Sequence, residues 1–421
     1  MPDARTTPRW AVACALLIIT ACPLQAAEPA PPFDVPCEAA VLMNTRSGMI
    51  ICAKNPDTLI PPASLTKVMT IVVALDAVDN GYASLNDEVP VSEKAWRTGG
   101  SKMFLAVNSR VPLRLLLEGI AVVSGNDACV AVAEHIAGVE EAFVEKMNRK
   151  AAEIGMRSTV FENSHGLPDG QHTTARDMAL LTRYHLSHHP ECLPMHSTKE
   201  MTYNSITQRN RNGLLWLEGG FDGLKTGWFS TAGYHIVATA HRNQDRFVAV
   251  VMGASSVRQR ETIARQLLNY GFKNFTTRKI LEPGTPLAEA SVRTGAQDHV
   301  NLGAAHPLVL TVARDSLEAI VVHNDFPQTV QAPVLQGQQF GQAKIMLHGQ
   351  ELASVSLVAL ENIQRAGLLK RALDTTALFF LRPPYWGALL LVLLLILVCC
   401  TKLGSRKKKS GSPRKHGDDF L

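Results

Sequence analysis

The chain has 421 residues, a length that allows two or three domains, and 46% of its residues are hydrophobic. Its formal net charge is +5, but the last twenty residues, 402–421, hold seven Lys or Arg and two Asp and so carry all of it (7 − 2 = 5). The remaining body is neutral, which excludes a basic nucleic-acid-binding surface, and no nucleic-acid partner is expected.

Residues 1–27 have the composition of a secretory signal peptide. Two arginines precede an uncharged apolar stretch that ends in small residues, so cleavage is expected at the end of this segment. The sequence ITAC at 19–22 also resembles a bacterial lipoprotein signal. Lipidation of Cys22 is therefore an alternative to simple cleavage.

Cysteine is sparse in the part of the chain that the signal would export. Four cysteines lie there, at positions 37, 52, 129 and 192. So few cysteines do not define a disulfide framework in a chain of this length. A bridge between Cys37 and Cys52 is an alternative to buried thiols, which we favour.

The N-terminal half of the body alternates strand and helix patterns. Residues 37–55 predict a hairpin, because two apolar runs flank a group of turn residues. Apolar residues at helical spacing run from Ser64 to an Asn-Gly pair at 80–81 and predict one helix. Residues 113–138 predict two helices that are interrupted at Ser124-Gly125.

Strand patterns return near residue 233. Residues 233–254 predict strand, turn and strand, and 260–272 predict a helix that packs afterwards. Strands at both ends of the segment 37–275, with helices between them, indicate one antiparallel sheet that contains both termini. The body is therefore expected to be α+β.

Beyond this segment the pattern changes to short β-type runs. Residues 277–360 contain several such runs separated by turn residues, which predicts a small all-β domain. Residues 364–384 follow as a juxtamembrane segment, and its first part is amphipathic. Residues 385–401 carry no charge and are just long enough to cross a bilayer as one helix. The basic tail 402–421 is expected on the cytoplasmic side of that membrane.

Three short motifs occur in order along the body. They are Ser64-Leu-Thr-Lys67, Ser124-Gly-Asn126 and Lys225-Thr226-Gly227. Each is common by itself. Together, and in a chain with an export signal, they form the motif set of penicillin-binding proteins and class A β-lactamases.

The first motif has the spacing of a nucleophile and its base. A serine hydroxyl is a poor nucleophile near neutral pH and needs a neighbouring group to take its proton. Residues three apart share a face of a helix, so Lys67 can direct its amine at Ser64. Lysine accepts a proton only when neutral, and burial or a nearby cation such as Lys225 lowers its pKa.

The other two motifs supply the remaining chemistry. Ser124 can relay a proton to a leaving amine, and Asn126 can hold both Lys67 and a substrate amide. A strand with the Lys-Thr-Gly sequence can bind an extended peptide along its edge, and Gly227 permits its close approach. Backbone N–H groups of Ser64 and Trp228 would form the oxyanion hole.

Over residues 37–365 the chain resembles the serine-type D-alanyl-D-alanine carboxypeptidases, which are low-molecular-mass penicillin-binding proteins. Three longer stretches carry this resemblance: NSHGLPDGQHTTARDMALL (163–181), RNRNGLLW (209–216) and AGYHIVATA (232–240). The resemblance implies a β-lactamase/transpeptidase-like catalytic domain at 37–275, followed by the all-β domain. It implies removal of the terminal D-alanine from peptidoglycan stem pentapeptides, acylation by β-lactams, and no cofactor or metal.

The resemblance also assigns residues. Ser64 would be the nucleophile, Lys67 the general base and Ser124 the proton relay. The substrate would be bound by Asn126, Lys225, Thr226, Gly227, Trp228 and Arg211. Arg211 lies in the motif nearest the site for the substrate's terminal carboxylate, with Arg260 as a weaker candidate.

Two features depart from the family pattern. Trp228 stands where relatives often carry histidine, which leaves the rate of acyl-enzyme hydrolysis open. A membrane-spanning segment at 385–401 replaces or supplements the usual amphipathic surface helix. The expected location is the inner (cytoplasmic) membrane, with one pass and the catalytic domain on the periplasmic side.

Other functions remain as alternatives. One is a D,D-endopeptidase that cuts peptidoglycan crosslinks, and another is a membrane-tethered wall-binding protein with a degenerate site. A β-lactamase is less favoured, because we find no Glu-x-x-x-Asn loop of the kind that positions a deacylating water. The histidines and cysteine of 184–196 invite a metal site, but a solvated helix end is favoured there.

Overall fold

The computed structural model describes residues 28–167, 170–371, 387 and 390–398. The predicted signal peptide and basic tail lie outside these residues, as do most of the juxtamembrane segment and much of the predicted membrane span. Within the part of the chain that is described, no helix combines the length and apolarity that a bilayer crossing requires.

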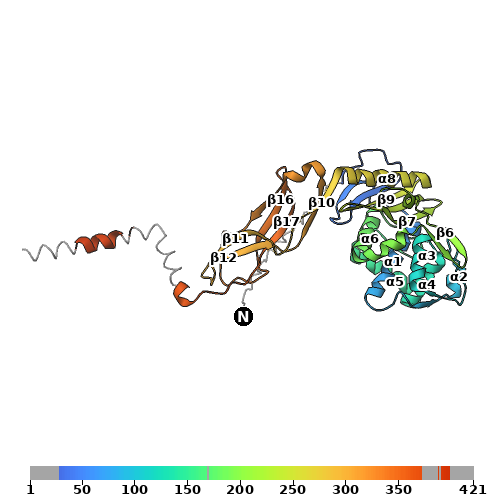
Figure 1. Ribbon diagram of the computed structural model, residues 1–421, viewed down its shortest axis with the longest axis horizontal. Helices are drawn as coiled ribbons and strands as arrows, with labels where there is room; N and C mark the ends of the chain where they lie inside the picture. The colour runs from blue at the N-terminus through green and yellow to red at the C-terminus, as the bar shows by residue number, and fades with distance from the viewer. Residues whose placement is uncertain (1–27, 168–169, 372–386, 388–389, 399–421) are drawn as a thin grey trace, which may run out of the picture. The chain divides into compact units, whose positions relative to one another are not determined.

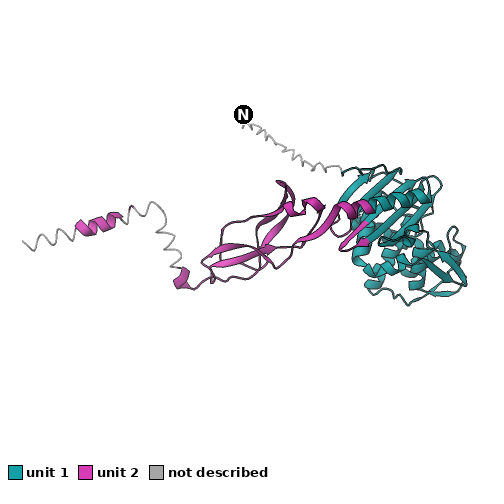
Figure 2. Cartoon of the chain, turned by 45° about the horizontal axis from the view of Figure 1, so that its top comes forward, with its two compact units in different colours: residues 1–43, 50–240, 248–268 teal, residues 44–49, 241–247, 269–421 magenta. Residues whose placement is uncertain are grey.

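The chain divides into two compact units (Figure 2). The first, here called the α+β unit, consists of residues 1–43, 50–240 and 248–268. The second, the β unit, consists of residues 44–49, 241–247 and 269–421. The α+β unit holds all three sequence motifs.

A five-stranded sheet is central to the α+β architecture. Its strands are β1 (Ala39–Asn44), β2 (Ile50–Lys54), β7 (Phe221–Phe229), β8 (Gly233–Arg242) and β9 (Asp245–Ala254). They lie in the order β2-β1-β9-β8-β7, so the N-terminal hairpin joins the C-terminal strands in one sheet, as predicted. Strand β7 lies at one edge of this sheet and pairs with β8 in antiparallel register. The Lys-Thr-Gly motif therefore lies on an edge strand.

Helices surround this sheet (Figure 1). They are α1 (Lys67–Asp79), α2 (Glu93–Arg97), α3 (Leu113–Val122), α4 (Asn126–Ala137), α5 (Glu140–Ile154), α6 (Ala175–His188), α7 (Leu193–Ser197) and α8 (Val257–Asn274). Helix α1 is buried from Lys67 to Leu75, so it is the central helix of the core. Its apolar residues pack with those of α3 and α4 in one hydrophobic cluster.

The start of α1 differs from the sequence expectation. Ser64 does not lie in the α-helix but in a 3₁₀ turn, η1 (Ala63–Thr66), and α1 begins at Lys67. The turn closes with the amide of Leu65 donating to the carbonyl of Pro62 at 3.1 Å. Residues i and i+3 eclipse each other in a 3₁₀ turn, whereas they are offset around an α-helix. The turn therefore aligns positions 64 and 67 on one side of the chain.

The interruption predicted at Ser124-Gly125 is present. Helix α3 ends at Val122, and α4 begins at Asn126. Between them Ser124 has a φ of +62°, in the left-handed region, which redirects the chain. Ser124 is buried at this turn, with 1% of its surface exposed.

The β unit is built almost entirely from strands. They are β10 (Phe275–Leu281), β11 (Pro286–Arg293), β12 (His299–Ala304), β13 (Leu308–Ala313), β14 (Ile320–Asp325), β15 (Thr329–Gln331), β16 (Gln339–Leu347) and β17 (Gln350–Ala359). Six of them form a sheet in the order β14-β16-β17-β12-β11-β15, and β10 pairs with β13. Alternating residues such as Val300 and Leu302 point into a small apolar core. The predicted all-β domain is confirmed.

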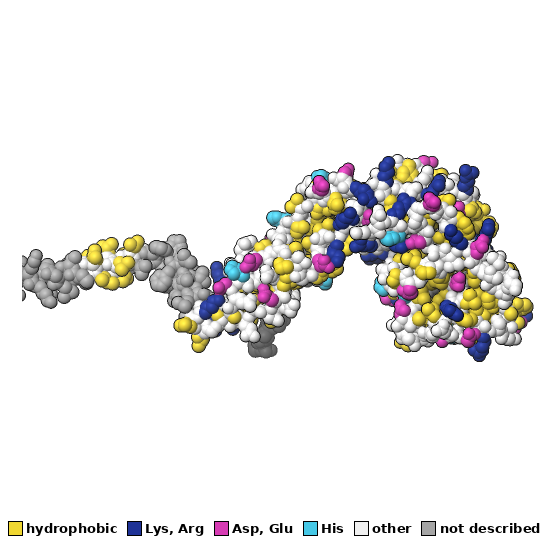
Figure 3. All heavy atoms as spheres, in the orientation of Figure 1, with side chains coloured by type: hydrophobic (Ala, Val, Ile, Leu, Met, Phe, Trp, Pro, Cys, Tyr) yellow, Lys and Arg dark blue, Asp and Glu magenta, His cyan; other side chains and the backbone are white. Residues whose placement is uncertain are grey.

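The surface carries both signs of charge. On the face drawn in Figure 3, Lys and Arg side chains lie among Asp and Glu side chains over much of the described surface. Several form exposed ion pairs, such as Arg97 with Glu93 and Lys279 with Glu282. Exposed pairs of this kind contribute little to stability, typically about 0–1 kcal/mol.

Candidate active site

Ser64 and Lys67 form a hydrogen-bonded pair where η1 meets α1. The Nζ atom of Lys67 lies 3.0 Å from the Oγ atom of Ser64. The same amine also donates to the backbone carbonyl of His165. Two acceptors therefore fix the position of the amine beside the hydroxyl, at a distance over which a proton can pass.

Lys67 is completely buried, with no exposed surface. Burial lowers its pKa from 10.5 to about 8, because the charged form loses hydration. The charge of Arg211 lowers the pKa further, whereas Cys129 and Asp127 raise it. With a pKa near 8, about a tenth of the amine is neutral at pH 7 and able to accept a proton.

A second lysine–serine pair lies close by. The Nζ atom of Lys225, on β7, donates to the Oγ atom of Ser124 at 3.0 Å and to the carbonyl of Thr226 at 3.0 Å. Burial lowers the pKa of Lys225 well below its ordinary value, and the charges of Lys67 and Arg211 act in the same direction. The sequence offered burial or a nearby cation such as Lys225 as the cause of a lowered pKa at Lys67, and burial is the largest cause at both amines.

The edge strand β7 passes close to the turn that carries Ser64. A Cβ atom at Gly227 would lie 3.3 Å from the carbonyl oxygen of Pro62 and 3.4 Å from the backbone nitrogen of Ser64. The first separation is tighter than most side-chain contacts, so the strand approaches this turn closely and glycine suits the position. The next residue, Trp228, exposes 56% of its surface, and its ring lies 6.1 Å from that of Tyr234.

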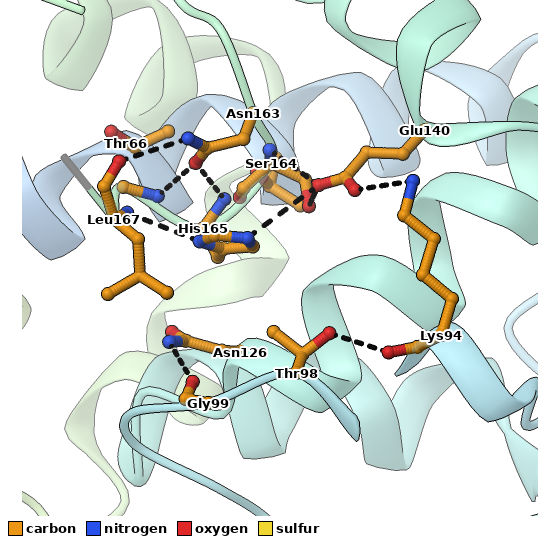
Figure 4. Close-up of polar contacts among 12 residues, drawn as sticks. Thr66, Lys94, Thr98, Gly99, Asn126, Glu140, Asn163, Ser164, His165 and Leu167 are labelled. Carbon is orange, nitrogen blue, oxygen red and sulfur yellow. Dashed lines mark hydrogen bonds and ion pairs between the residues drawn. The ribbon is translucent and has the colours of Figure 1, made fainter. Parts of the chain in front are cut away.

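Asn126 is the first residue of α4 and holds a neighbouring loop. Its Nδ2 atom donates to the carbonyl of Gly99 at 2.7 Å (Figure 4). Its backbone nitrogen donates to the carbonyl of Ser101 at 2.7 Å. Its expected contact with Lys67 is not among the hydrogen bonds of the described residues. The neighbouring Asp127 is buried and accepts from the backbone nitrogens of Met103 and Leu105. Together these contacts fasten the loop 99–105 to α4.

The loop that contains His165 forms another side of the site around Ser64 and Lys67. Glu140 accepts from the hydroxyl of Ser164 at 2.7 Å and forms an ion pair with Lys94 at 3.0 Å (Figure 4). Asn163 accepts from the backbone nitrogen of His165. These contacts hold the carbonyl of His165 against Lys67. No sequence motif indicates this role, because the acceptor is a backbone atom.

The two arginines that the sequence proposed have different surroundings. Arg211 is exposed and lines the cleft in front of Ser64. Arg260 is 4% exposed, and its guanidinium donates to three backbone carbonyls, those of Gly227, His235 and Arg211. Arg260 therefore braces β7 and the loop before it, whereas Arg211 presents its charge to the cleft.

These residues surround one cleft of about 660 Å³. Its wall contains Ser64, Gly100, Ser101, Asn126, His165, Gly166, Leu167, Arg211, Thr226, Gly227, Trp228, Phe229, Tyr234, Val257 and Arg260. The amines of Lys67 and Lys225 lie behind this wall. The cleft thus presents a hydroxyl backed by a buried base, an edge strand and an arginine, which suits acyl transfer from an extended peptide that ends in a carboxylate.

Two family models match the chain. The one described as D-alanyl-D-alanine carboxypeptidase, the peptidase S11 family, matches residues 25–256. The one described as penicillin-binding protein 5, C-terminal domain, matches residues 275–365. The first covers more than half of the chain, and the second covers most of the β-strands that follow α8.

Individual relatives agree with these models. D-alanyl-D-alanine carboxypeptidase DacA of Haemophilus influenzae is 39% identical over 354 residues, which are 82% of this chain and 90% of that protein. The solved structure of penicillin binding protein 5 from Haemophilus influenzae has a TM-score of 0.76 and 38% identity, and the match covers 80% of this chain and all of that one. Penicillin-binding protein D2 from Listeria monocytogenes, in its ampicillin-bound form, has a TM-score of 0.53 and 29% identity over 57% of this chain and 99% of that one.

Proposed function

The chain belongs to the D-alanyl-D-alanine carboxypeptidase family, and we propose that Ser64 is the nucleophile through which it acts. It is a serine-type carboxypeptidase of the penicillin-binding protein class, with peptidoglycan stem peptides as substrates and β-lactams as acylating inhibitors. One observation carries the assignment of the nucleophile: the fully buried amine of Lys67 lies 3.0 Å from the hydroxyl of Ser64.

Acylation begins with proton transfer. The neutral amine of Lys67 takes the proton of Ser64 as the serine oxygen attacks the carbonyl carbon of the penultimate D-alanine. The negative charge that develops on the carbonyl oxygen is stabilised by the backbone N–H groups of Ser64 and Trp228. Both groups belong to elements that lie side by side, since Gly227 approaches the backbone of Ser64.

Departure of the terminal D-alanine needs a proton on its nitrogen. Ser124 is the relay, because its hydroxyl accepts a hydrogen bond from Lys225 and can donate its own proton to the leaving amine. Ser124 is then reprotonated within the same network of buried amines. The result is an ester between Ser64 and the shortened peptide, and free D-alanine.

Hydrolysis of the ester completes the cycle. Lys67, again neutral, is the base that takes a proton from a water molecule, which attacks the ester carbonyl carbon. The same N–H groups stabilise the second intermediate, and the proton returns to the oxygen of Ser64. With a β-lactam the acyl group stays attached for longer, since the cleaved ring remains bound where the leaving amine would depart.

Binding energy comes from the strand edge and from charge. Asn126 and the β7 residues Thr226 and Gly227 line the cleft, so an extended peptide can lie along β7. The exposed guanidinium of Arg211 is placed to attract the terminal carboxylate. A peptide with a free C-terminus carries this carboxylate, whereas a peptide with a blocked C-terminus does not. Arg211 would therefore favour cleavage at the end of a peptide chain.

Membrane attachment is a further part of the proposal. It is supported by the uncharged run 385–401, the basic tail 402–421 and the signal-like segment 1–27. We place the enzyme in the inner membrane by one C-terminal helix, with its catalytic domain in the periplasm. The proposal keeps the predicted domain bounds, with a catalytic domain at 37–275 and an all-β domain at 277–360.

The activity is tested on the intact protein purified in detergent. D-alanine release from a stem pentapeptide is compared between the wild type and Ser64→Ala, and the proposal predicts release by the wild type alone. A crosslinked muropeptide dimer serves as the second substrate. Conversion of dimer to monomer without D-alanine release would favour the endopeptidase, and release by Ser64→Ala would remove Ser64 from its role.

A further inference from the structure

A second group of buried side chains lies outside the cleft. His185 is in the last turn of α6, Cys192 ends the 3₁₀ turn η2 (Pro190–Cys192), and His196 lies in α7. The two histidines have no exposed surface, and the cysteine is 3% exposed. The sequence favoured a solvated helix end here, and this expectation is wrong for these three residues. We call them the His–Cys cluster.

Their potential ligand atoms converge. One nitrogen from each histidine and the sulfur of Cys192 all lie within 4.8 Å of one another. Cys192 and His196 are four residues apart on a continuous helical run, so they share a face. All three residues fall within a twelve-residue segment, 185–196, and α6 ends just after the first of them. A short local segment therefore assembles the set at little cost in loop-closure entropy.

The hydrogen bonds within the cluster fix the histidine tautomers. The Nδ1 atom of His196 lies 3.2 Å from the carbonyl oxygen of Leu224, which can only accept, so this nitrogen carries the proton. The Nε2 atom of His196 consequently has a free lone pair. It lies 2.8 Å from the Nε2 atom of His185, which must donate. The Nδ1 atom of His185 has no hydrogen-bond partner among the described residues.

Full burial favours the neutral form of both rings, because a charged imidazole would lose its hydration. Only a neutral imidazole offers a lone pair to a metal ion. The hydrogen bond from His196 to the carbonyl of Leu224 is the outer contact that metal-binding histidines usually make.

A neighbouring group of residues provides a contrast. His189, four residues after His185, lies between Asp76 at 2.8 Å and Asp79 at 3.1 Å. These carboxylates outweigh burial and raise its pKa. His189 therefore forms ion pairs with these two carboxylates. The His–Cys cluster has no such carboxylate within the set and holds only soft neutral donors.

We propose that His185, Cys192 and His196 bind one thiophilic d¹⁰ metal ion, Zn²⁺ or Cu⁺, in a structural site separate from the catalytic cleft. The ion takes the place of the hydrogen that His185 shares with His196. Binding releases the thiol proton of Cys192 to solvent and moves the ring proton of His185 from Nε2 to Nδ1. No atom is oxidised or reduced. The Nδ1 atom of His185 lacks a partner in either tautomer.

The required adjustment is small. Ligand distances of about 2.0–2.1 Å to nitrogen place two tetrahedral nitrogens about 3.3 Å apart, so the rings separate by about half an ångström from their present position. Three donors complete a trigonal Cu⁺ site, in which the thiolate also neutralises the ion. Zn²⁺ adds a water molecule as fourth ligand. The two ions are distinguished experimentally.

The site connects to β7 through His196. Its side chain holds the carbonyl of Leu224, the residue before Lys225, and its own carbonyl accepts from the Nδ2 atom of Asn210 at 3.4 Å. A bound ion therefore fixes α6 and α7 against the strand that carries the Lys-Thr-Gly motif. It stabilises the fold and takes no part in acyl transfer.

Metal binding is measured on the intact wild-type protein in detergent, with Zn²⁺ and with Cu⁺ held reduced and buffered by a chelator. The proposal predicts one ion per chain. X-ray absorption should show one sulfur and two nitrogen ligands, at about 2.3 Å and 2.0–2.1 Å for zinc. A fourth light ligand identifies zinc with water, and its absence identifies Cu⁺. If neither Zn²⁺ nor Cu⁺ binds at one ion per chain, the proposal is overturned. This result needs no variant.

Variants then locate the site. Cys192→Ala and His196→Asn should lower metal affinity by at least about 10–100-fold, the loss that even outer-ligand changes cause. Cys52→Ala, another buried thiol, and His188→Asn, an exposed histidine of α6, are the matched controls and should bind as the wild type does. Undiminished binding by Cys192→Ala, or lost binding by Cys52→Ala, places the ion elsewhere and overturns the assignment.

Thermal unfolding provides an independent reading. Metal at about 100 times its Kd should raise the Tm of the wild type by about 5–10 °C. Cys192→Ala should show no such increase. An equal increase in this variant contradicts the proposal. Acylation by penicillin should be unaffected by Cys192→Ala, which separates failure of this site from failure of the catalytic assignment.

Discussion

The α+β unit and the β unit bury different kinds of side chain. Among the described residues, the α+β unit buries Lys67, Lys225 and Arg260, each at most 4% exposed. The described strands β10–β17 bury only threonines as polar residues, and the buried charged residue of the β unit is Asp245, a carboxylate that accepts from the backbone nitrogen of Thr277. A buried charge costs several kcal/mol unless it is compensated, so a fold keeps it only where it is needed. Among the described residues, buried amines and guanidinium groups therefore occur in the α+β unit, which also holds the cleft.

This difference can be tested by matched changes in the two units. Changes at the buried amines should alter acylation and leave folding intact. Changes in the core of the β unit should lower stability and leave the acylation rate unchanged. The predictions below run from the largest expected effect on acylation to the smallest.

Lys67→Met should have the largest effect among changes that spare the nucleophile. Loss of the base should lower the second-order rate of penicillin acylation by about 10²–10⁴-fold. The free energy of unfolding at pH 7 should not fall, because a buried methionine needs no hydration. The measurements are labelling with a fluorescent penicillin and chemical denaturation. Lys279→Met, in the β unit, is the control and should acylate at the wild-type rate; an equally fast Lys67→Met enzyme would refute the role of Lys67.

Gly166→Ala should disturb the wall of the cleft. A Cβ atom there would overlap the carbonyl oxygen of Ala63, and the residue has a φ of +89°. Since Ala63 precedes Ser64, a misplaced nucleophile is expected to lower the acylation rate by up to about 10²-fold. Gly284→Ala is a close control, because its φ is +81° but no atom lies within 4 Å of the added carbon. A Gly166→Ala enzyme that acylates as fast as Gly284→Ala would contradict this role of Gly166 in the cleft wall.

The pH dependence of acylation should report Lys67. Its pKa of about 8 means that the neutral amine, and with it the rate at saturating penicillin, increases as pH rises through about 8. Arg211 lowers this pKa by its charge. Arg211→Gln should therefore move the midpoint to higher pH. A midpoint that stays fixed, or moves to lower pH, would mean that another group controls the rate.

Ile345→Ala should leave acylation unchanged. Ile345 is fully buried in the core of the β unit, and its truncation should cost about 2–5 kcal/mol of stability. Denaturation of the β unit and penicillin labelling below its unfolding transition provide the two readings. A slowed acylation rate in the folded variant would show that the β unit takes part in the chemistry.

Much of the fold and site could be predicted from local patterns. Apolar periodicity located the hairpin at 37–55 and the helices at 113–138, and turn residues located the interruption at Ser124. The spacing of the first motif predicted that Ser64 and Lys67 act as a pair. The 3₁₀ turn at Ser64 was not predicted, because four residues are too few to distinguish a period of 3.0 residues per turn from one of 3.6.

Other features depend on contacts that leave no side-chain pattern. Lys67 donates to the carbonyl of His165, and Arg260 donates to three carbonyls. These acceptors are backbone atoms that any residue could provide. Burial of His185 and His196 depends on how α6 and α7 pack in the finished fold. A polar sequence at the end of a helix gave the opposite expectation.

The central claim is tested most directly by locating the acyl group. The intact protein is reacted with penicillin, digested, and the modified serine is identified by mass spectrometry. The account predicts that the acyl group is on Ser64 and that Ser64→Ala gains no mass. An adduct on Ser124, or on any other residue in the wild type, would contradict it.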